Sequence, residues 1–98
     1  MSSKIKSKDV DFLFDAILQL RTREECYMLF EDLCTVQEMK ALSQRLVVAK
    51  MLSEGRVYSD IVKTTGASTA TISRVKRSLD YGCDSYSLVF DRMEAEEK

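Results

Sequence analysis

The stretch from Ser59 to Leu79, SDIVKTTGASTATISRVKRSL, constrains the fold most, because it reads as two short helices joined by a tight turn. Gly66 stands where the first helix must stop and the backbone needs a positive φ, and Ser68 can cap the second helix. Two helices that cross steeply can turn one apolar set inward and keep a polar set outside. The inward set is Ile61, Val62, Ala67, Ile72, Val75 and Leu79, and the outward set is Thr69, Ala70, Thr71, Ser73, Lys76 and Arg77. This division is what a helix-turn-helix DNA reader requires.

The charges of the chain support this interpretation, although the net charge is only −1. Residues 61–79 carry four cations and no acid, whereas residues 84–98 carry five acids against two bases. Because screening makes charge interactions local, a basic patch on the reader matters more than the sum. Short polar side chains at the start of the second helix are expected at base edges, and cations at phosphates. The predicted DNA-binding residues are Ser59, Lys63, Ser68, Thr69, Ala70, Thr71, Ser73, Arg74, Lys76 and Arg77.

Composition predicts an all-α protein. The 98 residues include no proline and only three glycines, and they are rich in good helix formers. This length predicts a single domain over residues 1–98, small enough that a partner subunit would help to cover apolar surface. No apolar run approaches a membrane span, and the N-terminus lacks a secretory signal, so we expect a cytoplasmic protein without membrane contact. The three cysteines, Cys26, Cys34 and Cys83, form no CxxC and are expected as reduced, mostly buried thiols.

Helix boundaries follow from capping signals. Residues 1–7 are expected to be a flexible tail, followed by a helix from about Lys8 to Leu20. Two capping boxes, TREE at Thr22 and TVQE at Thr35, predict one helix from near Arg23 to near Cys34 and a longer one over about 36–53. The helix-turn-helix is predicted over 57–79 and a last helix over 84–98, which makes about six helices.

The first predicted helix is apolar over much of its circumference. Val10, Leu13, Ile17 and Leu20 form one face, with Phe12, Phe14 and Leu18 beside it. One small subunit has too little other helix to cover such an arc on two sides, so the sequence predicts a homodimer.

Catalysis is not expected. The chain has no histidine, no Gly-rich phosphate loop and no metal-ligand spacing, so we predict neither an enzyme nor a metal or other cofactor site. The alternative to a DNA-binding regulator is a helical protein-interaction module that does not bind DNA, which the acidic C-terminal segment keeps open.

The run from Thr35 to Leu79 resembles the central part of the Trp repressor family, and the whole chain is similar to the YerC/YecD-type branch of that family. The shared features are a Thr that opens the long helix, E-x-x-A-L-x-x-R ending at Arg45, Gly55, and G-A-x-x-A-T-I-S/T-R from Gly66 to Arg74. The resemblance implies an intertwined homodimer that presents two reading heads to palindromic double-stranded DNA as a transcriptional regulator, most simply a repressor.

The resemblance also implies a possible pocket for a small-molecule corepressor of unknown identity, at Thr35, Arg45, Arg74, Val75 and Ser78. In tryptophan-responsive members, two arginines that match Arg45 and Arg74 sandwich the indole. Val75 stands where those members have glycine, and its branched side chain would fill the space of the ring. The resemblance therefore implies DNA binding more strongly than a tryptophan response, and Arg45 has the alternative role of pairing with a neighbouring acid.

Overall fold

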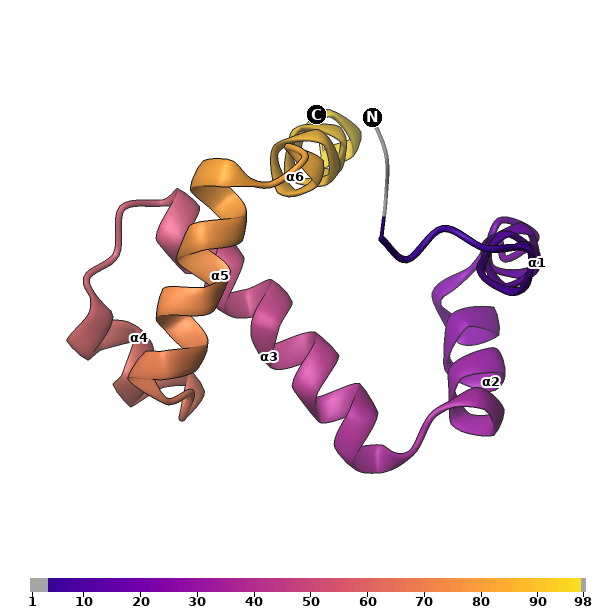
Figure 1. Ribbon diagram of the computed structural model, residues 1–98, viewed down its shortest axis with the longest axis horizontal. Coiled ribbons are helices and arrows are strands. Elements are labelled where there is room, and N and C mark those ends of the chain that lie inside the picture. Colours follow the sequence, from indigo (N-terminus) through magenta and orange to yellow (C-terminus); the bar gives the residue numbers. More distant parts are fainter. Residues whose placement is uncertain (1–3, 98) are drawn as a thin grey trace. The chain divides into compact units, whose positions relative to one another are not determined.

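A computed structural model of the chain describes residues 4–97, which form six α-helices (Figure 1). The helices are α1 (Lys8–Ile17), α2 (Arg23–Leu33), α3 (Val36–Ser53), α4 (Tyr58–Thr65), α5 (Thr69–Tyr81) and α6 (Ser85–Glu97). The prediction of an all-α fold is confirmed for these residues, which contain no strand. Within the same range, no helix has both the length and the apolar character that a membrane crossing requires. Residues 1–3 of the expected tail, and residue 98, lie outside the described part.

The contacts divide the chain into two compact units that meet at residues 39 and 40 within α3. In the first unit, the helix starts follow the capping signals. The Thr35 box forms completely, because Thr35 Oγ1 accepts from the Glu38 N–H at 3.1 Å and Glu38 Oε1 accepts from the Thr35 N–H at 2.8 Å. The bond from the Thr35 backbone N–H, followed by the effect of the Thr35 hydroxyl, lowers the pKa of the exposed Glu38 carboxyl below its usual value of 4.5. At the Thr22 box, Glu25 Oε1 accepts from Arg21 N–H instead, at 2.8 Å.

Two features of the first unit differ from prediction. Helix α1 ends at Ile17 rather than near Leu20, because the Gln19 and Leu20 N–H groups bond three residues back, to Ala16 and Ile17, and so tighten the chain into a turn. Its start is fixed by Ser7, which was expected in the tail but whose Oγ accepts from the Val10 N–H at 3.1 Å.

The thiols do not follow the prediction either. All three cysteines are free, but Cys26 and Cys83 are exposed and only Cys34 is partly covered, because neither α2 nor the connection after α5 has a buried residue within this chain.

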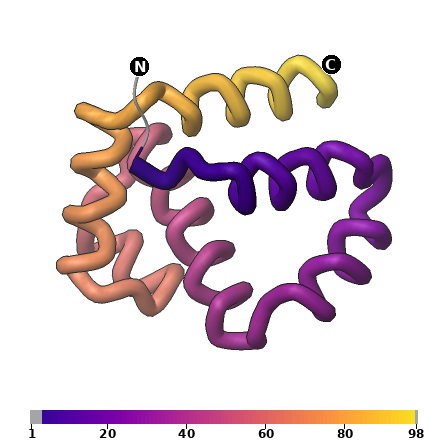
Figure 2. The backbone as a smooth tube through the Cα atoms, turned by 45° about the vertical axis from the view of Figure 1, so that its right-hand side comes forward, coloured from indigo at the N-terminus to yellow at the C-terminus, as the bar shows by residue number. Residues whose placement is uncertain are grey.

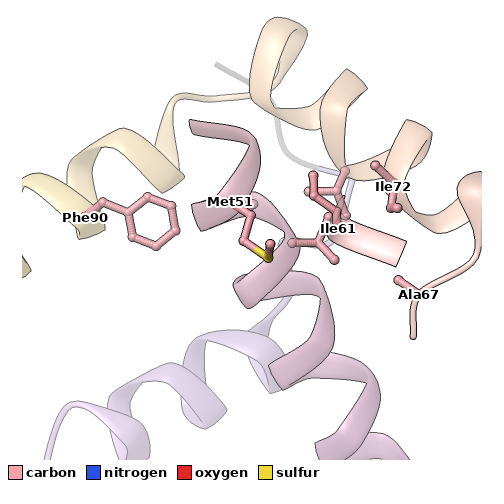
Figure 3. Close-up of a cluster of buried hydrophobic side chains, with 8 residues drawn as sticks. Met51, Ile61, Ala67, Ile72 and Phe90 are labelled. Atoms are coloured by element: carbon pink, nitrogen blue, oxygen red, sulfur yellow. The ribbon is translucent and has the colours of Figure 1, made fainter. Parts of the chain in front are cut away.

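The second unit, residues 40–97, contains the hydrophobic core. Val48, Ala49 and Met51 of α3 pack with Ile61 of α4 and Ile72 of α5, and in the view of Figure 3 Ile61 lies between Met51 and Ile72. The cluster is completed by residues of the turn, α5 and α6, namely Ala67, Val75 and Phe90. Each helix of this unit therefore contributes to one cluster, and α3 is its common support.

Besides the burial of Phe90 in the core cluster, Lys50 of α3 makes two contacts with α6. Lys50 Nζ lies 5.1 Å from the centroid of the Phe90 ring and 3.7 Å from Glu94 Oε1. Tyr86 stacks on Phe90 with ring centroids 6.0 Å apart. The chain enters α6 through Asp84, a non-glycine residue with a positive φ of 63°.

Candidate nucleic-acid interface

The connection between α4 and α5 is a tight turn with a left-handed residue at its start. Gly66 caps α4 with φ 73° and ψ 4°, and its N–H donates to the Val62 carbonyl at 2.9 Å. L side chains rarely adopt this backbone conformation, which explains the glycine. Figure 2 follows the chain through this turn, and Figure 1 shows α4 and α5 crossing steeply. The predicted helix-turn-helix is thus present in the local backbone.

Hydrogen bonds hold the turn on both sides. Thr65 Oγ1 donates to the Ile61 carbonyl at 2.7 Å and accepts from the Ala67 N–H at 3.1 Å. From α3, Gln44 Nε2 donates to the Thr65 carbonyl at 3.2 Å. These bonds satisfy carbonyls at the open end of α4 and tie that end to the long helix.

The inner face of the motif agrees with the sequence at most positions. Ile61 and Ile72 are fully buried, and Ala67 and Val75 are each 2% exposed, with Leu79 packed partly against the cluster. Val62 is a wrong assignment, since it is 36% exposed. It follows Ile61 directly, and one residue turns a helix by about 100°, so both side chains cannot face one core.

The outer face presents polar and cationic side chains to solvent. Of the predicted DNA-binding set, only Thr71 is partly covered; the exposed members are Ser59, Lys63, Ser68, Thr69, Ala70, Ser73, Arg74, Lys76 and Arg77. Thr71 is drawn into the helix cap, because its N–H donates to Ser68 Oγ at 3.1 Å and the two hydroxyls lie 3.1 Å apart. Thr69, Ala70 and Ser73 are left as the short side chains of α5 that are exposed and outside the cap.

The four cations of this surface are not equivalent. Lys76 Nζ lies 3.1 Å from Asp80 Oδ1 one turn later, so its charge is partly compensated. Lys63, Arg74 and Arg77 form no ion pair with any residue of the described range. Asp60, the acid that precedes the basic run, pairs with Arg56. The hydrogen bond that it accepts raises the pKa of Arg56 above its usual value. The exposed surface of the motif thus keeps three cations, one on α4 and two on α5, that pair with no acid of the described residues.

Comparison with known proteins identifies the fold and family. The sequence model described as Trp repressor protein matches residues 8–94. The chain belongs to the Trp repressor family. It is 54% identical to YerC of Bacillus subtilis strain 168, itself uncharacterised, over 96% of this chain and 90% of that protein.

Two solved structures of similar proteins have the same fold. A candidate Trp repressor from Staphylococcus aureus superposes with a TM-score of 0.91 at 56% identity, covering 95% of this chain and 96% of that one. A TrpR-like protein from Eubacterium eligens gives 0.89 at 57% identity, covering 93% and 94%. The expected fold, a Trp-repressor-like arrangement of six helices, is confirmed, and the family is one of DNA-binding regulators rather than of enzymes.

The five positions of the predicted corepressor pocket have unequal surroundings. Val75 is buried in the core cluster, so its side chain packs in the core rather than lining an opening. Arg45 is half-buried and Arg74 is exposed, and Ser78 Oγ donates to the Arg74 carbonyl at 3.4 Å. Thr35 belongs to the first unit, where its hydroxyl is used in the α3 cap. The alternative role of Arg45 is not supported, because it pairs with no acid among residues 4–97.

Sequence reasoning missed two residues that shape this surface. Gln44 anchors the end of α4, and a single sequence contains no signal for a bond across 21 positions. Asp80 compensates Lys76, and this pair could have been found from its i, i+4 spacing on α5.

Proposed function

We propose that this member of the Trp repressor family is a homodimeric transcriptional regulator, acting as a cytoplasmic repressor on palindromic double-stranded DNA. The observation that carries the proposal is the α4–α5 motif, with its αL glycine, its capped second helix and an exposed surface on which Lys63, Arg74 and Arg77 pair with no acid of the described residues. In a helix-turn-helix, the N-terminal residues of the second helix enter the major groove while the first helix crosses the backbone.

The exposed side chains divide by the DNA group that they suit. Thr69, Ala70 and Ser73 are short and exposed near the start of α5, and can approach base edges or bind them through water. Ser68 and Thr71 use their hydroxyls in the cap, so we assign them chiefly to holding the helix terminus. The longer cations, Lys63, Arg74, Lys76 and Arg77, suit phosphates and supply most of the affinity through counterion release.

The dimer is supported by apolar side chains that one chain leaves in water. Neither α1 nor α2 has a buried residue, and Phe12 and Leu18 are each 76% exposed. In α3, Leu42 and Leu46 are 45% and 44% exposed. Burying one large apolar side chain stabilises by about 1.5–3 kcal/mol, so these positions together favour association strongly. Two reading heads would then meet half-sites about one helical turn, roughly 34 Å, apart.

The DNA-binding half of the proposal is tested by selecting bound fragments from genomic DNA and measuring affinity for the enriched duplex by fluorescence anisotropy. We expect steep salt dependence and weakened binding for Arg77→Ala, with little change for Arg92→Ala, which removes the same charge from the exposed surface of α6. Binding that ignored both salt and Arg77→Ala would contradict the proposed reading surface, and the absence of binding to any fragment would favour the protein-interaction module.

The dimer is tested separately by sedimentation at low protein concentration. A homodimer is expected, together with unfolding whose midpoint rises with protein concentration. A stable folded monomer would refute the argument from the exposed faces of α1 and α2.

For the effector, we propose that Val75 prevents a tryptophan-type response. Calorimetry with tryptophan should show no binding at micromolar concentration to the wild-type chain. Micromolar binding would show that the buried valine leaves the pocket open.

A further inference from the structure

One hydrogen bond joins the end of α4 to the long helix that carries it. Gln44 Nε2 of α3 donates to the Thr65 carbonyl at 3.2 Å, across 21 positions of the chain. Every other side-chain hydrogen bond within residues 4–97 joins positions at most four apart. In the part of the chain that the structure describes, Gln44 therefore makes the one long-range hydrogen bond of a side chain.

The packing around this bond is open. A hollow of about 410 Å³ lies between α3 and the end of α4, and both Gln44 and Thr65 line it. Val47 lines it as well and is 49% exposed, whereas the next two residues of α3, Val48 and Ala49, are fully buried in the core cluster. Gln44 precedes this buried pair by about one helical turn. The hydrogen bond thus spans an end of the two helices that apolar contacts leave open.

The bonded carbonyl belongs to the peptide group that leads into the turn. The N–H of the same group, that of Gly66, donates to the Val62 carbonyl at 2.9 Å, so the peptide plane is held at both ends. Thr65 Oγ1 also accepts from the Ala67 N–H at 3.1 Å, and Ser68, the N-cap of α5, follows directly. A rotation of this peptide group would therefore swing the start of α5, where the short exposed side chains lie.

The α4–α5 motif is attached to α3 at two places. The first is the core cluster, to which Ile61 of α4 and Val48 of α3 both belong, and the second is the bond between Gln44 and the Thr65 carbonyl. Along each of the two helices these places are four residues, or about 6 Å, apart. A body held at one place can pivot about it, whereas a second attachment at this distance fixes its angle.

We propose that Gln44 is the positioning residue of the α4–α5 motif, because its bond sets the angle of the motif on α3 and so the half-site spacing that a dimer reads. This role rests on the proposed function, since spacing has a meaning only for a dimer with two motifs on DNA. It needs no small molecule, because both groups of the bond belong to the chain. Without the bond, the core still holds the motif, which then adopts a range of angles and reads several spacings with less affinity.

The variant Gln44→Met tests this role, because methionine nearly keeps the length of glutamine but has no donor. Affinity is measured by fluorescence anisotropy on the duplex enriched from genomic DNA and on versions with one base pair added or removed between its half-sites. One base pair shifts a half-site by about 3.4 Å and turns it by about 35°.

We expect the wild type to prefer the enriched spacing. In Gln44→Met, the ratio of affinities for the enriched and altered spacings should fall at least about threefold, and binding to the enriched duplex should weaken about fivefold, since losing one hydrogen bond changes an equilibrium about two- to tenfold. The matched control is Gln37→Met, which makes the same change at an exposed position of α3 and should leave the ratio unchanged.

The spacing preference separates positioning from stability. A variant that was only less stable would lose affinity for all three duplexes in the same proportion and would keep the preference of the wild type. That outcome would overturn the role of Gln44. Gln44→Glu keeps the length of the side chain and loses the donor when ionised, so it should show the same reduced preference, and it replaces Gln44→Met if that variant does not fold.

Amide hydrogen exchange of the free protein tests the attachment without DNA. In Gln44→Met, the Gly66 and Ala67 amides should exchange at least about threefold faster relative to the Ile72 amide, which lies in the core-packed part of α5. Unchanged relative rates would overturn the attachment. A wild-type chain that binds no DNA fragment would refute the proposed function, and hydrogen exchange would still decide whether Gln44 holds the turn.

Discussion

Asp80 restrains the basic surface of α5, and removing its charge should strengthen DNA binding. Its carboxylate lies 3.1 Å from Lys76 Nζ, and both side chains are more than a third exposed. An exposed pair of this kind contributes about 0–1 kcal/mol to folding, so Asp80→Asn should leave the protein folded. In the wild type this pair holds Lys76 back from a phosphate, whereas in the variant the lysine is free to neutralise one.

The size of the effect follows from counterion release. Each phosphate neutralised contributes about 0.9 to the slope of log K against log salt. One freed lysine in each subunit of a dimer therefore steepens the slope by about 1.8. When salt is raised from 50 to 200 mM, the variant should therefore lose about twelvefold more affinity than the wild type loses. At low salt the variant should bind more tightly than the wild type.

Anisotropy titrations of a labelled duplex over this salt range would measure both quantities. Asp91→Asn is the matched control, because it removes an exposed acid of α6 that forms no ion pair in the described chain. The double variant Lys76→Ala/Asp80→Asn should lose the gain. An unchanged slope for Asp80→Asn, or an equal gain for Asp91→Asn, would refute the assignment of Lys76 to a phosphate.

The remaining predictions concern the scaffold of the reader. Ile72→Ala should lower the free energy of unfolding by about 2–5 kcal/mol in denaturant titrations, because Ile72 is fully buried, while Thr69→Ala on the exposed face should change it little. Gly66→Ala should cost about 1–2 kcal/mol from its left-handed backbone, and an unchanged unfolding midpoint would contradict that conformation. Because the pKa of Glu38 is lowered in the folded state, its ionised carboxylate stabilises the fold above about pH 4.5. This contribution to stability is lost as the pH falls through the folded-state pKa. Glu38→Gln should therefore flatten the acid limb of the stability profile.

Local signals in the sequence predicted the helices well. Capping residues and glycines act over a few positions, so the starts of α2 and α3 and the turn at Gly66 could be read directly. The end of α1 was wrong because three-residue hydrogen bonds close its last turn without a glycine or proline to mark it. The Trp-repressor-like fold itself came from the motif between Thr35 and Leu79, which is specific enough to carry the architecture.

Burial could not be read with the same success, because it depends on which helices meet. Phe90 is the core residue of α6, whereas its apolar neighbours Leu88, Val89 and Met93 are 50%, 42% and 53% exposed. Nothing in the local pattern distinguishes these neighbours, since all are apolar. The structure buries Phe90 in the core cluster, where Lys50 of α3 also contacts its ring.

The exposed apolar positions have a common explanation in the proposed dimer. Side-chain caps form the starts of helices α1 and α2, but one cap contributes only about 1 kcal/mol to stability. The apolar faces of both helices remain exposed to water. Helices of this length have little stability without a packed face. The capping signal of α1 therefore specifies where the helix begins, and its apolar residues need a partner subunit to be buried. The reading surface of α5, by contrast, is supported within one chain by Ile72 and Val75, so its exposed side chains are set before any partner arrives.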